Sequence, residues 1–200
     1  MADFNKFTKR SIQAVNDCQS VAVEHGNQSI DQEHLLMALL DQDDSLVEKL
    51  LEKAGVNTDA FKNDIQGIIN RKPKVQGGQN YISTDLNNAF NEAEKAAKQM
   101  NDEYVSTEHI FLGIIAKPSR ELEQVFRKYG INKETFLSAL QGVRGNQRVT
   151  SDNPEDTYDS LSKYAQNLVD LARKQKLDPV IGRDSEIRSI IMILSRKTKN

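Results

Sequence analysis

The sequence predicts an all-α protein built from two four-helix repeats that are related by a pseudo-twofold axis. A stretch that begins at Ile30 as Ile-Asp-Gln-Glu-His-Leu-Leu returns 75 positions later, from Val105, as Val-Ser-Thr-Glu-His-Ile-Phe. Apolar residues recur at three- and four-residue spacing on both sides of each copy, which is the period of a helix. Capping residues and helix-ending glycines also recur at the same spacing, so the copies share a fold and not merely a composition.

The first repeat is predicted to occupy residues 1–71. A long amphipathic helix precedes the motif and ends near Gly26. Asp31 can cap the motif helix through its side-chain oxygen, and the helix is apolar nearly all round, so we expect it to be buried at the centre. Asp44 can cap a third helix and Asn57 a fourth.

The second repeat, residues 82–143, follows the same plan after a connector at 72–81 that is rich in Gly and Pro. Ser106 takes the capping position of the second motif helix. Ser119 and Asn132 match the caps of the third and fourth helices. Neither repeat is large enough to bury a good core alone, so we expect the two to pack together.

Beyond the repeats the helical pattern stops. Residues 144–156 are mostly polar and are predicted to form a linker. Residues 157–200 contain two more predicted helices, the second capped by Asp184. These helices have strong apolar faces and too little surrounding mass to cover them, so we expect them to begin a further domain.

The composition excludes several classes of protein. The 27 basic and 29 acidic residues are interspersed and give a net charge of −2, so no nucleic-acid partner is expected. No apolar run approaches the roughly 18 residues of a membrane span, and the N-terminus lacks the features of a signal peptide. The single cysteine, Cys18, excludes an internal disulfide framework and fits a reducing cytoplasm.

No catalytic residue and no metal site can be assigned. The three histidines, His25, His34 and His109, lack metal-ligand spacing. His34 and His109 hold equivalent positions, which favours a shared structural role in the first turn of each motif helix. No Gly-x-x-x-x-Gly-Lys-Ser/Thr sequence is present, so we do not expect this chain to hydrolyse a nucleotide. A binding module remains, because the seam between two helical units commonly forms a groove for a peptide or a partner helix.

The motifs resemble a known family. The doubled motif, Gln32–Leu40 and Ser106–Leu112, resembles the Clp amino-terminal repeat domain. The stretch Lys176–Arg188 is similar to the opening of the first AAA+ ATPase module of Clp unfoldases. The stretches Val143–Thr150 and Asn153–Asp156 are similar to the linker of the disaggregating chaperones of this family. The resemblance covers essentially the whole chain.

The resemblance implies that this chain is the amino-terminal, substrate-engaging part of a longer cytoplasmic chaperone. Such a protein is a homo-hexameric AAA+ ATPase that uses ATP with Mg²⁺ to recover aggregated proteins after stress. Its implied partners are unfolded or aggregated polypeptides and a DnaK-type chaperone system, with no nucleic acid and no membrane. We expect the chain itself to be monomeric and to hold no cofactor.

The resemblance also implies an apolar groove flanked by polar residues. Matched onto this sequence, the substrate-binding residues are Thr8, Phe90, Ala93, Ala97, Asp102 and Glu108. For Glu108, a capping role at a helix start is an equal alternative. Val180 and Ile181 match positions that line an adenine pocket, and without a phosphate loop they should bind nucleotide weakly or not at all.

Two other functions stay open. The chain could be the adaptor-docking regulatory domain of a protease-coupled Clp unfoldase, although the linker favours the disaggregating chaperones. It could also be an enzyme in its own right, which a nucleotide-turnover assay would reveal.

Overall fold

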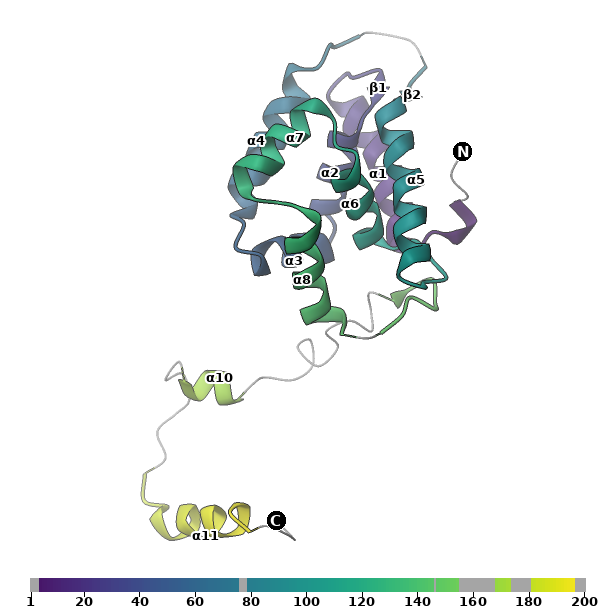
Figure 1. The fold of residues 1–200 in the computed structure, drawn as a ribbon. Coiled ribbons are helices and arrows are strands. Elements are labelled where there is room, and N and C mark those ends of the chain that lie inside the picture. Colours follow the sequence, from purple (N-terminus) through teal and green to yellow (C-terminus); the bar gives the residue numbers. More distant parts are fainter. Residues whose placement is uncertain (1–3, 76–78, 146, 155–167, 174–180, 197–200) are drawn as a thin grey trace. The chain divides into compact units, whose positions relative to one another are not determined.

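The structure is a computed structural model that divides into two units, Met1–Asp159 and Ser160–Asn200 (Figure 1). The residues that it describes are 4–75, 79–145, 147–154, 168–173 and 181–196. The first unit is helical apart from one short pair of strands. The predicted fold class, all-α with two four-helix repeats, is confirmed.

The two repeats contain the same elements in the same order. A short 3-10 helix, η1 (Phe4–Lys6), precedes them. The first repeat consists of α1 (Lys9–Glu24), β1 (Ser29–Ile30), α2 (Gln32–Leu40), α3 (Leu46–Lys53) and α4 (Thr58–Arg71). The second consists of β2 (Tyr81–Ile82), α5 (Thr84–Gln99), α6 (Thr107–Ala116), α7 (Arg120–Tyr129) and α8 (Lys133–Arg144).

Reciprocal pairing between the repeats makes the pseudo-twofold relation visible in the backbone. Ile30 pairs with Ile82 in the parallel β1–β2 pair, and Phe7 pairs with Val105 in a parallel bridge at the equivalent place. The backbone N–H of Ser83 donates to the Ile30 carbonyl oxygen at 3.0 Å. In the equivalent contact, the backbone N–H of Thr8 donates to the Val105 carbonyl oxygen, also at 3.0 Å. Helices of one repeat also pack against helices of the other, α3 against α8 and α4 against α7. Each repeat therefore completes the core of the other.

The two motif helices form the centre of this core. Figure 1 shows α2 and α6 in the middle of the unit, with α4 and α7 on one side and α1 and α5 on the other. All nine residues of α2 are buried. Gly113 lets α6 lie directly on α5, because a Cβ atom there would sit 2.2 Å from the Ala89 carbonyl oxygen and 2.8 Å from the Ala93 nitrogen.

Two predicted caps shift by one residue. Ser45, not Asp44, caps α3, and its Oγ accepts from the Glu48 N–H at 3.3 Å. Asp44 adopts a left-handed conformation with φ of 58°, which an aspartate tolerates better than most residues. Asp184 is the first residue of α11 and the cap position is Arg183.

The structure also differs from the predicted linker. Residues 144–156 were expected to be free of the repeats, but Arg144 and Val149 are buried. Val149 is an apolar residue that reaches the core, and Arg144 meets buried carboxylates. The described part of this stretch is therefore anchored on the first unit.

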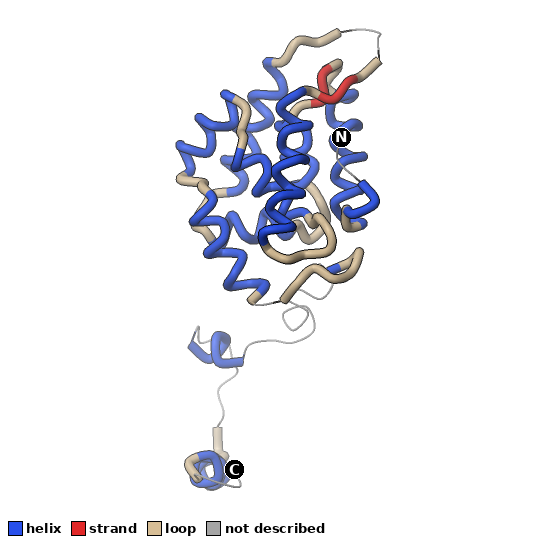
Figure 2. The backbone as a smooth tube through the Cα atoms, turned by 45° about the vertical axis from the view of Figure 1, so that its right-hand side comes forward, coloured by secondary structure: helices blue, strands red, loops and turns tan. Residues whose placement is uncertain are grey.

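The second unit is described in two helices, α10 (Leu168–Arg173) and α11 (Asp184–Leu194), drawn in blue in Figure 2. The apolar side chains of α11 are exposed, Leu194 to 65%. The predicted stripe residues Tyr158, Leu161 and Ala165 lie outside the described residues. No helix in the described part of the chain is long and apolar enough to cross a membrane.

The contact at Gly113 yields a test of the core. Gly113→Ala should lower the free energy of unfolding by about 3 kcal/mol, because the new methyl group would collide with backbone atoms that cannot rotate away. Chemical denaturation measures this change. Gly67→Ala in α4 is the matched control, since its Cβ would meet nothing within 4 Å, and it should stabilise the protein by about 0.5–1 kcal/mol. Equal effects of the two substitutions would contradict the packing described here.

Candidate functional site

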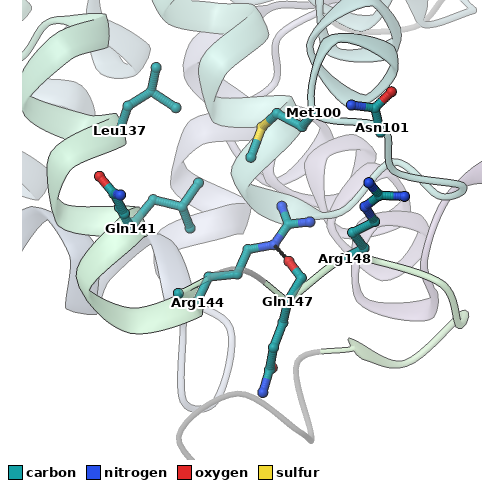
Figure 3. A pocket seen from close by; sticks show the side chains of 9 residues that line it. Met100, Asn101, Leu137, Gln141, Arg144, Gln147 and Arg148 are labelled. Atoms are coloured by element: carbon teal, nitrogen blue, oxygen red, sulfur yellow. Dashed lines mark hydrogen bonds between the residues drawn. The ribbon is translucent and has the colours of Figure 1, made fainter.

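The candidate site is a pocket of about 490 Å³ at the end of the second repeat (Figure 3). It lies between the C-terminal end of α5, the last turns of α8 and the residues that follow α8. Apolar side chains form one part of its lining and amides and guanidinium groups form the rest. The lining residues are Met100, Asn101, Leu137, Leu140, Gln141, Arg144, Gly145, Gln147 and Arg148.

Local structure explains why these residues meet. Leu137, Gln141 and Arg144 follow one another at four- and three-residue spacing, so they share one face of α8. Met100 caps the C-terminus of α5, and Asn101 has a left-handed φ of 57° that turns the chain there. Hydrogen bonds within the segment after α8 bring Gln147 back beside Arg144, whose Nε donates to the Gln147 carbonyl oxygen at 2.5 Å.

Arg144 is the charged centre of the pocket wall. Its Nη2 donates to the carboxylate of Asp102, and its Nη1 lies 3.8 Å from Glu108. Its side chain is only 4% exposed, so the guanidinium is held by these acids and not by water. Burial by itself would raise the pKa of Asp102, but contacts from His109, Arg144 and the Val149 amide outweigh it and lower the pKa to about 2. Asp102 is therefore ionised at neutral pH and Arg144 has a permanent partner.

Glu108 is buried near the same guanidinium group. Its carboxylate is 0% exposed, and among the described residues it has no hydrogen-bond partner. The equivalent residue of the first repeat, Glu33, accepts from the Ser119 hydroxyl at 2.5 Å and lies 3.0 Å from Lys72 Nζ. The equivalent glutamates of the two repeats thus have different partners. Glu108 lies close to Arg144, which lines the candidate pocket.

Behind the pocket, a buried histidine organises the start of α6. His109 Nδ1 lies 3.0 Å from the Ser106 backbone nitrogen, and His34 makes the same contact with Asp31 at the start of α2. A backbone N–H can only donate, so Nδ1 accepts and the ring proton sits on Nε2. His109 Nε2 lies 3.0 Å from Asp102 Oδ2. The predicted structural role of the two histidines in the first turn is therefore confirmed.

Five of the six residues predicted to contact substrate are buried, and Asp102 is partly buried with a side chain that is 0% exposed. Asp102 and Glu108 come together around Arg144. Thr8 caps α1, with its Oγ1 accepting from the Ser11 N–H at 3.3 Å. Three further residues, Phe90, Ala93 and Ala97, lie on the buried face of α5. The groove expected along that face is filled by the protein's own side chains, including Phe4 and Phe7 against Phe90.

Of the two residues matched to an adenine pocket, Ile181 is 85% exposed and Val180 lies outside the described residues. Within the described ranges, no three side chains of the His, Cys, Asp or Glu type gather as a metal site.

None of the nine lining residues was among the six predicted from the sequence. Arg144 and Val149, which shape the site, were both assigned to the linker. A signal for each was present, because Arg144 continues the Leu137 face of α8 and Val149 is an isolated aliphatic residue in a polar stretch.

The fold defines a two-repeat helical domain, and comparison with known proteins gives its family. The chain matches the Clp repeat (R) N-terminal domain family over residues 6–129 and belongs to that family. It is 46% identical over 204 residues to the chaperone protein ClpB of Nitratidesulfovibrio vulgaris and 45% identical over 202 residues to that of Clostridium perfringens. These alignments cover 99% and 98% of this chain but only 24% and 23% of the two relatives.

Solved structures show the same fold. The Hsp104 N-terminal domain from Candida albicans matches with a TM-score of 0.66 and 21% identity, over 74% of this chain and 97% of that one. The N-domain of ClpV from Vibrio cholerae matches with a TM-score of 0.59 and 24% identity, over 70% of this chain and 85% of that one.

The buried histidine cap predicts a pH dependence. Burial lowers the pKa of His34 from 6.5 to about 4, so the unfolded chain binds more protons than the folded one between these values. The free energy of unfolding should therefore fall as the pH is lowered from 6.5 towards 4. Denaturation across this range measures it. His34→Gln should flatten the pH dependence, and an unchanged pH dependence in this variant would contradict the assignment.

Proposed function

We propose that this chain is the substrate-engaging amino-terminal part of an ATP-dependent chaperone of the ClpB type, and that it holds segments of unfolded or aggregated polypeptide in the pocket between α5 and α8. The single observation that carries the proposal is this pocket, with an apolar floor and guanidinium groups at its wall. The similarity to proteins named as ClpB chaperones supports the proposed class of client.

The chemistry of the pocket suits an unfolded chain. Its volume of about 490 Å³ lies within the range of small-ligand sites and has room for a few side chains. Met100, Leu137 and Leu140 offer apolar contact to a side chain that a folded protein would hide. Arg148 is exposed and can donate to backbone carbonyl oxygens, which every polypeptide carries. Such a site needs little sequence specificity in its ligand.

The residues matched to substrate binding then take supporting roles. We propose that Asp102 and Glu108 act from behind the pocket by holding Arg144. Thr8 fixes the start of α1, and Phe90, Ala93 and Ala97 fix α5, whose end carries Met100.

For the longer protein we propose a homo-hexameric, cytoplasmic AAA+ ATPase that works with a DnaK-type chaperone system. Residues 157–200 would begin its ATPase module, and ATP with Mg²⁺ would supply the energy for moving polypeptide. Val180 and Ile181 remain the proposed contacts for adenine. No Gly-x-x-x-x-Gly-Lys-Ser/Thr sequence occurs in the 200 residues of this chain.

Substitution of the pocket floor tests the proposal. Leu137→Gln should weaken binding of a permanently unfolded polypeptide, such as reduced and carboxymethylated lactalbumin, about 5- to 30-fold, because apolar contact worth about 1–2 kcal/mol is lost. Fluorescence anisotropy with the labelled polypeptide measures the affinity.

Val23→Gln is the matched control for this experiment. Val23 is an apolar residue on α1 that is 57% exposed and does not line the pocket. The Val23→Gln variant should bind the polypeptide with the same affinity as the unsubstituted protein. If Val23→Gln alone weakened binding, the binding site would lie on α1 and the proposal would be wrong. No binding by any variant would favour the adaptor-docking function.

A further inference from the structure

The segment that follows α8 folds back onto the domain, and we call residues 147–152 the strap. Val149 is 0% exposed, and its carbonyl oxygen accepts from the Glu103 N–H at 2.9 Å. Further along, the Asp152 carbonyl oxygen accepts from the Lys9 N–H at 2.9 Å, and the two side chains form an ion pair at 2.9 Å. The strap is therefore fastened at two places, one buried and one exposed.

The buried fastening converges on a single carboxylate. Asp102 Oδ1 accepts from the Val149 N–H at 2.8 Å and also from Arg144 Nη2. Asp102 Oδ2 faces His109 Nε2 at 3.0 Å. One side chain thus ties together the end of α8, the strap and the start of α6. Both fastenings involve charges, but water screens the ion pair at Lys9, whose side chains are exposed, whereas the Asp102 and Arg144 side chains are buried. The buried fastening should therefore be the stronger one.

The first repeat contains a neutral version of the same fastening. Asn27 holds the position equivalent to Asp102, and its Oδ1 lies 3.0 Å from His34 Nε2. Its Nδ2 donates to the Pro73 carbonyl oxygen at 3.2 Å, so the connector after α4 folds back as the strap does. Asn27 also forms a bridge with Lys74. Folding back is therefore part of each repeat, and the residue beside the buried histidine is neutral in the first repeat and charged in the second.

The strap and its neighbours build one wall of the pocket. Four of the nine lining residues lie at the end of α8 or after it: Arg144, Gly145, Gln147 and Arg148. We propose that Asp102 is the positioning residue of this pocket, a latch that holds the strap and hence the wall in place. The role of the wall in binding polypeptide rests on the function proposed above, whereas the latch itself does not.

Asp102→Asn tests the latch in the full chain. Asn27 shows that an asparagine fits beside the buried histidine, so the variant should fold. Hydrogen exchange of the Val149 amide, followed by NMR, should become about tenfold faster or more, while the Leu35 amide in the first repeat keeps its rate. Asp152→Asn is the matched control, because it removes only an exposed ion pair and should leave Val149 exchange unchanged.

The outcomes separate the latch from the proposed function. Unchanged Val149 exchange in Asp102→Asn would overturn the latch. Faster exchange together with at least about fivefold weaker binding of the unfolded polypeptide would support both parts of the proposal. Faster exchange with unchanged affinity would overturn the positioning role. If no variant binds polypeptide, the proposed function fails and the exchange rates still decide the latch. Val149→Ser offers a second route to a released strap that leaves the Asp102 side chain intact.

Discussion

The need to cap two buried helices governs this structure. The first N–H groups of any helix lack partners within the helix, and at the start of α2 and α6 no water can reach them. A histidine in the first turn of each helix supplies an acceptor to the cap residue, at 3.0 Å in both repeats. That contact fixes the tautomer, so the far nitrogen of each ring needs an acceptor of its own. Asn27 and Asp102 lie at these far nitrogens.

The proposed function depends on a place where the two repeats differ. Asn27 is neutral and holds a connector, whereas Asp102 is charged and holds Arg144 and the strap. Arg144 then stands at the wall of the pocket, with Glu108 close behind it. The two repeats share one core, and the second repeat carries a carboxylate near the pocket where the first carries an amide.

Much of the fold could be predicted from the sequence because local signals repeat in it. The caps Asn57, Ser119 and Asn132 lie where the sequence predicts, since a short polar side chain before an apolar run is a strong signal. The choice between Asp44 and Ser45 was ambiguous because both are good caps. The crossing of α3 onto α8 depends on tertiary packing and has no local signal.

The candidate site was less predictable. The resemblance pointed to Asp102 and Glu108, but their burial behind Arg144 depends on how the strap folds. A single buried residue such as Val149 has no periodicity, so a polar stretch around it looks like a linker.

An amide-resolved NMR titration of this chain with a permanently unfolded polypeptide tests the central claim most directly. If the polypeptide binds in the pocket between α5 and α8, chemical-shift changes should cluster at Met100, Leu137, Gln141 and Arg148, with little change along the exposed face of α1. Changes confined to α1, or none at high concentrations of polypeptide, would contradict binding in this pocket.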